Sequence, residues 1–194
     1  MTKLKIVKIA CNEILMHGVE QINIKNLANR TGLNIEKLNT LFQYGDQELL
    51  MDAVEYAGKV WVSQIKKKIQ DSHNISDKLK ILANSYTMGS KDFSQSLSTY
   101  IDLWKIVKDQ KDEYIKTRLK SIYNFYISEF VNIATDIGCK SISKKELNSF
   151  AVMMTILSDV IHIQSVTLDN EVDFDSLSRV ICQITKQFLI GDIV

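Results

Sequence analysis

The absence of proline constrains this chain more than any other feature of its sequence. None of the 194 residues is proline, although an average protein of this length contains roughly ten. Proline removes a backbone N–H donor and clashes with the preceding helical turn, so a chain without it accepts long, uninterrupted helices. Apolar residues recur every three or four positions along nearly the whole sequence, and no stretch alternates with a period of two. The sequence therefore predicts an all-α protein.

Capping residues divide this helical pattern into nine expected helices. Asn23 and Asn34 suit N-caps, Ser143 and Glu146 form a capping box, and Gly32 suits a helix end. The expected helices cover approximately residues 3–16, 24–31, 35–42, 46–65, 76–88, 93–107, 111–136, 143–168 and 173–190.

The lengths of these helices indicate two parts. The first three are short, and a long helix follows from Asp46. We therefore expect an N-terminal three-helix head over residues 1–47, and a C-terminal six-helix domain for ligand binding and dimerisation over residues 48–194.

Charge and cysteine content exclude several classes of protein. The net charge is only +1, so any nucleic-acid surface is a local patch. The cysteines Cys11, Cys139 and Cys182 lack metal-ligand spacing and fit buried thiols in a reducing compartment. No apolar run reaches the roughly 18–20 residues of a membrane span, and the amphipathic N-terminus, which carries Glu13, does not fit a signal peptide. We expect a cytoplasmic protein with no membrane partner.

Residues 24–38, IKNLANRTGLNIEKL, have the spacing of a helix-turn-helix motif. Ala28 is small enough for two helices to approach closely, Gly32 supplies the turn, and Asn34 caps the second helix. Such a motif places its second helix in the major groove of DNA. The residues of this helix expected to face inward are Ile35, Leu38, Leu41 and Phe42.

The N-terminal pattern resembles that of the TetR/AcrR family of transcriptional regulators. The matching positions are Ala10, Ile14, Gly18, the run Ile24–Gly32, Leu38, Phe42, Gly45–Leu50 and Asp52–Val54. The specific match covers residues 6–54. The resemblance implies a homodimer that binds an operator in double-stranded DNA through its heads and a small molecule through its bodies.

Several residues depart from the family's pattern. Asn39 stands where the family has an aromatic residue, Gln47 replaces a lysine, and Gln43 and Tyr44 are additional. Residues 1–47 carry six cations, which are Lys3, Lys5, Lys8, Lys25, Arg30 and Lys37, and four anions, which are Glu13, Glu20, Glu36 and Asp46. Because phosphate contacts supply much of the affinity for DNA, we expect modest binding with a shallow salt dependence.

The polar residues around the second helix of the motif are the expected DNA contacts. Lys37 suits guanine, Asn39 suits adenine, and Glu36 suits the amino group of cytosine. Lys25 and Tyr44 are better placed for phosphates. The full expected set is Lys25, Asn34, Glu36, Lys37, Asn39, Thr40 and Tyr44.

Aromatic residues of the body are candidates for a ligand pocket, on the strength of the family resemblance. A mostly apolar cavity with a few hydroxyl and indole donors suits a hydrophobic or aromatic small-molecule effector. The candidates are Trp61, Tyr86, Tyr100, Trp104, Tyr123 and Tyr126. The alternative for each of these residues is ordinary core packing.

Two apolar stripes near the C-terminus are expected to form the dimer interface. Paired across a two-fold axis, the last two helices give a four-helix bundle, which the resemblance also implies. A dimer presents two heads to a palindromic operator. The expected interface residues are Phe150, Met154, Leu157, Ile161, Leu177, Ile181, Ile184 and Phe188.

No constellation of catalytic or metal-binding residues stands out. His17, His73 and His162 are isolated from one another and from ligand-spaced carboxylates, so we expect no enzyme activity, cofactor or metal. The cations of residues 66–68 and 105–120 are expected to lie on solvated faces.

The leading hypothesis is a repressor that an effector releases from its operator. The alternative is a TetR-like lipid or small-molecule-binding protein without a DNA-binding role. Leu41, Phe42, Gly45, Glu48 and Leu49 faintly resemble a segment of the ubiquinone-biosynthesis lipid-binding proteins that share this fold.

Overall fold

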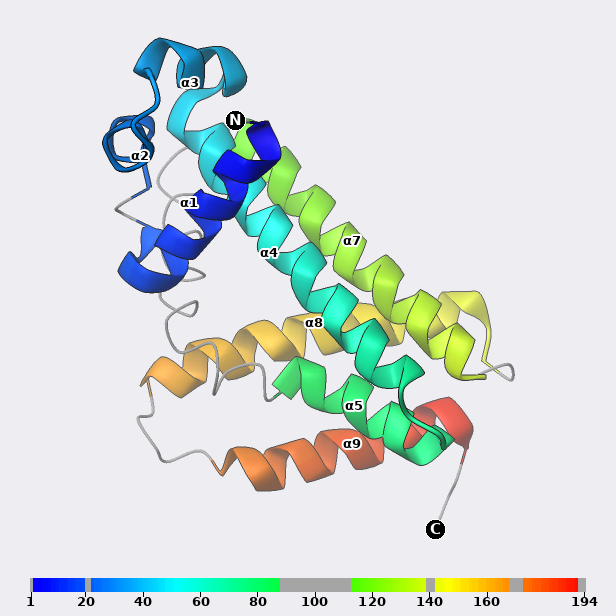
Figure 1. The fold of residues 1–194 in the computed structure, drawn as a ribbon. Helices are drawn as coiled ribbons and strands as arrows, with labels where there is room; N and C mark the ends of the chain where they lie inside the picture. The colour runs from blue at the N-terminus through cyan, green and yellow to red at the C-terminus, as the bar shows by residue number, and fades with distance from the viewer. Residues whose placement is uncertain (1, 20–21, 88–112, 139–141, 168–172, 192–194) are drawn as a thin grey trace. The chain divides into compact units, whose positions relative to one another are not determined.

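The computed structural model describes residues 2–19, 22–87, 113–138, 142–167 and 173–191. Within these ranges the chain forms α-helices and no strands, which confirms the all-α prediction (Figure 1). The helices are α1 (Lys3–His17), α2 (Ile24–Thr31), α3 (Ile35–Leu41), α4 (Gly45–Gln70), α5 (Ile75–Thr87), α7 (Glu113–Ile137), α8 (Lys144–Thr167) and α9 (Phe174–Ile190). The helix expected over residues 93–107 lies outside the described residues.

Side-chain caps form where the sequence predicts them. The side chain of Asn23 accepts a hydrogen bond from the backbone N–H of Asn26 at 2.7 Å. The backbone N–H of Ser143 donates to Glu146 at 3.1 Å, while the backbone N–H of Glu146 donates to the Ser143 hydroxyl at 3.3 Å. These contacts satisfy donors that a helix leaves open at its N-terminus, so each helix start is set by local chemistry.

The chain divides into two compact units. Unit 1 comprises residues 1–60 and 94–122, and unit 2 comprises residues 61–93 and 123–194. Unit 1 thus contains more than the head expected over residues 1–47, because the first half of α4 and the start of α7 belong to it.

Unit 1 has an apolar core to which each of its first four helices contributes. The most deeply buried side chains of these four helices are Ile6, Ala10, Leu27, Leu38, Phe42, Leu49, Met51 and Ala53, and Ile115 of α7 is buried with them in unit 1. The three- and four-residue spacing of these positions is that of single helix faces. The short helices α2 and α3 pack on each other and are held in place by this core.

In unit 2, α5 lies along α9 and also against α8 (Figure 1). A chain of ring contacts runs through its core from Trp61 to Tyr86, Phe130, Phe150 and Phe188, with centroid separations of 5.8, 5.3, 5.9 and 4.1 Å. Such contacts add to the stabilisation from burying large apolar surfaces. No helix in the described parts of the chain combines the length and apolarity of a membrane span.

Candidate nucleic-acid interface

The turn between α2 and α3 positions α3 at the surface of unit 1. Gly32 follows α2 with φ 66° and ψ 15°, a left-handed conformation that glycine adopts without strain. The Thr31 hydroxyl donates to the carbonyl of Leu27 at 2.7 Å, and the side chain of Asn34 accepts from the backbone N–H of Glu36 at 2.8 Å. Both ends of the turn are therefore fixed by hydrogen bonds, as the sequence predicts for Gly32 and Asn34.

The outer face of α3 is polar and exposed. Leu38 is fully buried and anchors the helix. Lys37 and Asn39 are exposed and make no hydrogen bond or ion pair with any described residue. The Thr40 hydroxyl donates to the carbonyl of Glu36 at 2.9 Å and keeps its lone pairs for other donors. This helix therefore offers several unused polar groups to a partner.

All the residues expected to contact DNA lie at the surface. The exposed set comprises Lys25, Asn34, Glu36, Lys37, Asn39, Thr40 and Tyr44. Exposure is a requirement that each of them meets, and their roles in binding DNA stay predictions.

Ile35 departs from the sequence-based expectation. The prediction that it faces inward is wrong, because its side chain is 44% exposed. The buried position of α3 is taken by Leu38, and Ile35 lies almost one turn earlier, at the first residue of the helix. The three- and four-residue spacing of apolar residues does not by itself show that Ile35 lies outside the core.

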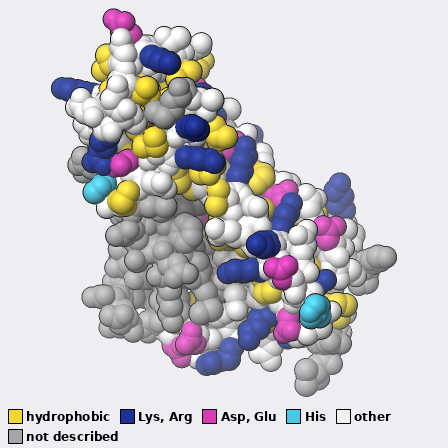
Figure 2. Space-filling model, in the orientation of Figure 1, with side chains coloured by type: hydrophobic (Ala, Val, Ile, Leu, Met, Phe, Trp, Pro, Cys, Tyr) yellow, Lys and Arg dark blue, Asp and Glu magenta, His cyan; other side chains and the backbone are white. Residues whose placement is uncertain are grey.

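Ion pairs within unit 1 neutralise part of the positive charge of the head. Arg30 on α2 pairs with Glu13 on α1, and Lys3 pairs with Glu48 at 2.5 Å and with Asp52 at 2.9 Å. In Figure 2, the Lys and Arg side chains on the visible face are dispersed among uncharged and hydrophobic ones. The electrostatic attraction for phosphates is therefore weaker than the count of cations suggests.

Asp46 connects the start of α4 to the start of α2. Its carboxylate accepts a hydrogen bond from the backbone N–H of Ile24 at 2.7 Å. The first N–H groups of a helix have no partner within the helix and attract anions. In this chain the Asp46 carboxylate already accepts a hydrogen bond from the N–H of Ile24, so that donor is satisfied within the protein. The sequence around Asp46 indicates the start of the long helix but not this hydrogen bond, because the two residues are 22 positions apart and no local pattern links them.

Tyr44 has contacts that the prediction of a phosphate ligand did not include. Its ring stacks on that of Tyr114 in α7, with centroids 4.3 Å apart and an interplanar angle of 17°. Its backbone N–H donates to Glu48 at 3.1 Å. Tyr44 nevertheless remains 62% exposed, so most of its side chain is accessible to solvent despite the stack.

Arg118 joins α7 to α4 within unit 1. It donates to Asp52 at 2.8 Å and to Glu55 at 2.7 Å. Burial alone would raise the pKa of Glu55, but hydrogen bonds from Lys59 and Arg118 outweigh it and lower that pKa. The prediction that Arg118 lies on a solvated face is therefore wrong. In unit 2, Lys66 pairs with Glu129 and stays partly exposed, while Lys67 and Lys68 are exposed, as the sequence predicts.

Of the described aromatic residues of the expected ligand pocket, Tyr86 belongs to the core of unit 2, Trp61 packs against that core, and Tyr123 and Tyr126 are partly buried. Trp61 packs edge-on against Tyr86 and Tyr126, with centroids 5.8 and 5.7 Å apart. Tyr86 is buried, which raises the pKa of its hydroxyl. The Tyr123 hydroxyl and Asp159 are hydrogen-bonded at 2.8 Å. Two further candidates, Tyr100 and Trp104, lie outside the described residues, and a ligand-binding role for the set stays a prediction.

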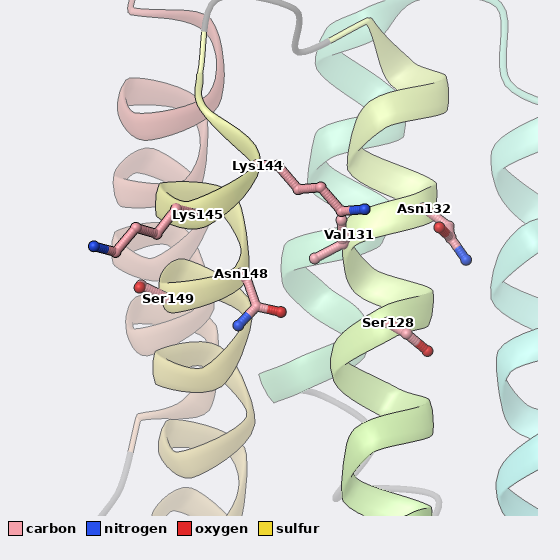
Figure 3. A pocket seen from close by; sticks show the side chains of 7 residues that line it. All are labelled: Ser128, Val131, Asn132, Lys144, Lys145, Asn148 and Ser149. Carbon is pink, nitrogen blue, oxygen red and sulfur yellow. The ribbon is translucent and has the colours of Figure 1, made fainter.

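A groove between α7 and α8 differs in character from the expected pocket. It has a volume of about 670 Å³ and is lined by Ser128, Val131, Asn132, Lys144, Lys145, Asn148 and Ser149. Lys144 extends toward α7, whereas Lys145 points away from it (Figure 3). The groove is open, most of its lining residues are polar, and none of the aromatic candidates lines it. In the described ranges no three His, Cys, Asp or Glu side chains are arranged to hold a metal ion.

Half of the expected dimer-interface residues lie inside the core of unit 2. Those at 5% exposure or less are Phe150, Met154, Ile161 and Ile181, while Leu157 and Leu177 are partly buried and Ile184 and Phe188 are exposed. The four buried side chains leave no surface for a partner, because they pack against their own chain.

The helices α8 and α9 each carry a stripe of exposed apolar residues. Those on α8 are Met153, Ile156 and Val160, and those on α9 are Val180, Ile184 and Phe188, with Ile190 also exposed at the end of α9. On α8 the exposed stripe is shifted by one position from the expected one. A periodic pattern predicts that a helix has an apolar face, but tertiary packing determines which part of that face stays exposed.

The comparisons with known proteins give the fold. No protein-family model matches the sequence, and no curated protein is significantly similar to it. A TetR transcription regulator from Haloarcula marismortui has a TM-score of 0.66 at 12% identity, covering 97% of this chain and 96% of that one. The regulator FadR from Bacillus subtilis, in complex with stearoyl-CoA, has a TM-score of 0.65 at 15% identity, covering 95% and 97%.

A third similar structure comes from Saccharomonospora viridis. This protein, assigned as a transcriptional regulator and bound to choline, has a TM-score of 0.66 at 14% identity, covering 98% of this chain and 96% of that one. The chain therefore has the all-α fold of TetR-type regulators, as its sequence predicts.

The contact of Asp46 with Ile24 generates a prediction about stability. We expect Asp46→Ala to lower the free energy of unfolding by about 1 kcal/mol, the usual effect of losing a side-chain cap. Asp71→Ala is the matched control, because Asp71 is exposed and makes no side-chain contact with the described residues. Urea denaturation followed by circular dichroism measures both. Equal stability of the two variants would contradict a capping role for Asp46.

Proposed function

We propose that this chain is a ligand-responsive, DNA-binding transcriptional regulator that acts as a homodimer. The observation that supports this most directly is α3, which follows the turn fixed at Gly32 and Asn34 and whose polar face stays exposed. A helix held this way after a short turn suits insertion into a major groove. The likeness of the fold to solved regulators supports the same function.

Base recognition is proposed to depend on the polar side chains of α3. Lys37 donates to guanine O6 or N7, Asn39 pairs with the N6 and N7 edge of adenine, and Glu36 accepts from the amino group of cytosine. Lys25, near the start of α2, contacts a phosphate. Because Arg30 and Lys3 are already paired inside unit 1, base contacts supply a larger share of the affinity than in a strongly basic head.

The dimer is proposed to form through the exposed stripes of α8 and α9. Exposed apolar side chains in contiguous rows are typical of interaction surfaces. A two-fold arrangement brings each stripe against a second copy and presents two α3 helices to a palindromic operator.

A small molecule is proposed to control release from the operator, and the regulator is proposed to be a repressor. One protein of similar fold holds stearoyl-CoA and another holds choline. We favour a hydrophobic or aromatic effector because of the aromatic residues clustered in unit 2. Since α4 and α7 each contribute residues to both units, an effector that favours one of their conformations changes the affinity for DNA.

A second candidate function is small-molecule or lipid binding without DNA. The observation that favours it is the partial neutralisation of the positive charge of the head. Arg30 and Lys3 form ion pairs within unit 1, and the backbone N–H of Ile24 donates a hydrogen bond to Asp46. These contacts weaken three groups suited to phosphates. Under this alternative, DNA binding is absent and ligand binding persists.

Substitution of Lys37 and Lys25 tests the DNA-binding proposal. We expect the protein to enrich a palindromic duplex from a random library, and Lys37→Ala to raise the Kd for that duplex by roughly 5- to 150-fold. Lys25→Ala weakens specific and non-specific binding alike and reduces the salt slope by about 0.9 for each phosphate that is no longer neutralised. Fluorescence anisotropy at several salt concentrations measures both effects.

Lys68→Ala is the control for these substitutions, because Lys68 is exposed in the last turn of α4 and its side chain makes no hydrogen bond or ion pair with the described residues. It should bind the duplex like the wild type. Failure to enrich any sequence, together with salt-independent binding, supports the second candidate function and contradicts the first.

Addition of small molecules to the protein–DNA complex tests the response to a ligand. We expect a hydrophobic compound, for which stearoyl-CoA is the first probe, to raise the Kd for the duplex about 5- to 150-fold, a coupling of about 1–3 kcal/mol. Because the coupling between two binding sites is the same in both directions, the duplex should raise the Kd for the compound by the same factor. Choline serves as a small polar comparison. A compound that binds saturably and leaves the Kd for DNA unchanged argues against ligand control through that site.

Ile184→Glu tests the dimer surface. Ile184 is 46% exposed on α9, so a carboxylate there leaves the monomer folded but is buried unpaired in the dimer. We expect the dimer to dissociate at least about 100-fold more readily, because burying an unpaired charge costs several kcal/mol. Leu4→Glu is the control, since Leu4 is 56% exposed on α1 in unit 1, whereas the two stripes belong to unit 2. Analytical ultracentrifugation gives the masses, and unchanged dimers of Ile184→Glu would rule out this surface.

A further inference from the structure

The exposed side chain of Ile35 has no role in the contacts described so far. Every other exposed residue of α3 is polar, namely Glu36, Lys37, Asn39 and Thr40. Ile35 alone adds an apolar group to this surface, and it does so at the first residue of the helix. In a helix-turn-helix the N-terminal residues of the second helix lie closest to the base edges.

The structure holds Ile35 in a defined position. The side chain of Asn34 accepts from the backbone N–H of Glu36, which fixes the first turn, and Leu38 anchors the helix in the core. Isoleucine is branched at Cβ and strongly prefers a single χ1 rotamer in a helix. A contact made by Ile35 therefore costs little conformational entropy.

Ile35 and Asn39 are neighbours on the helix surface, because residues four positions apart lie one turn apart on the same side. The Asn39 side chain is exposed and makes no hydrogen bond or ion pair with a described residue, and asparagine suits the N6 and N7 edge of adenine. A side chain one turn toward the start of the helix lies over an adjoining base pair.

We infer that Ile35 reads the C5-methyl group of a thymine next to the base contacted by Asn39. The thymine methyl is the one apolar group that the bases present in the major groove. A phosphate is excluded as the neighbour of Ile35, since an apolar side chain gains nothing from it and the adjacent Glu36 repels it. This inference rests on the proposed function and adds to it a preference for thymine at one position of each half-site.

The experiment removes the methyl group from the DNA without changing its base pairing. A duplex enriched from a random library by the wild type is resynthesised with each thymine of the half-site replaced in turn by deoxyuridine. We expect one position at which the wild type loses about fourfold in affinity at each half-site, the effect of one buried methyl at about 0.8 kcal/mol. Ile35→Ala binds the thymine duplex about fourfold more weakly per half-site and is insensitive to deoxyuridine there.

Leu4→Ala is the matched control, because Leu4 is an apolar residue of unit 1 that is 56% exposed on α1 rather than on α3. It should respond to deoxyuridine as the wild type does. The inference is overturned if no deoxyuridine position weakens the wild type, or if Ile35→Ala loses the same factor as the wild type. In both cases the enriched duplex still demonstrates DNA binding, so the proposed function survives. If no duplex is enriched at all, the proposed function and the inference fall together.

Discussion

Three carboxylates along one face of α4 set the conditions under which unit 1 holds together. Glu48, Asp52 and Glu55 follow one another at four- and three-residue spacing, so they lie side by side and repel unless cations separate them. Lys3 comes from α1 to meet the first two, and Arg118 comes from α7 to meet the last two. Cations from two helices that are far apart in the sequence, α1 and α7, thus meet this face of α4. Each carboxylate has a second partner, because Glu48 also accepts from the backbone N–H of Tyr44, Asp52 meets both cations, and Glu55 also pairs with Lys59. Removing one cation therefore weakens the network but leaves every carboxylate with a partner.

This network explains why sequence reasoning succeeds for some features and fails for others. The caps at Asn23 and Asn34 and the turn at Gly32 depend on residues within four positions, so local chemistry predicts them. Arg118 meets Asp52 across 66 residues, and no pattern near either residue signals the pair. The burial of Met154 rather than Met153 is also a tertiary outcome, because both residues belong to the apolar face of one helix. Sequence therefore predicts the helices and the α2–α3 motif, whereas partners and uncovered surfaces require coordinates.

The ion pairs also bear on how a head of this kind would recognise DNA. Cations that are already paired within the protein cannot release counterions from a duplex, so in the proposed regulator the non-specific component of DNA binding would be small. Discrimination then depends on hydrogen bonds and apolar contacts at base edges, which are short-ranged and sensitive to geometry. The rigid anchoring of α3 through Leu38 and Phe42 suits this requirement, because side chains on a fixed helix need little reorganisation when they meet their bases.

The hydrogen bond between Asp46 and the backbone of Ile24 has a consequence for observing motion in this chain. The first N–H groups of a helix usually exchange their protons with water quickly, because they have no partner within the helix. In α2 the amide of Ile24 is protected as long as the start of α4 remains docked. Its rate of hydrogen exchange therefore follows the opening of this contact rather than the fraying of α2 itself, and a single amide resonance becomes a natural reporter of how α4 moves.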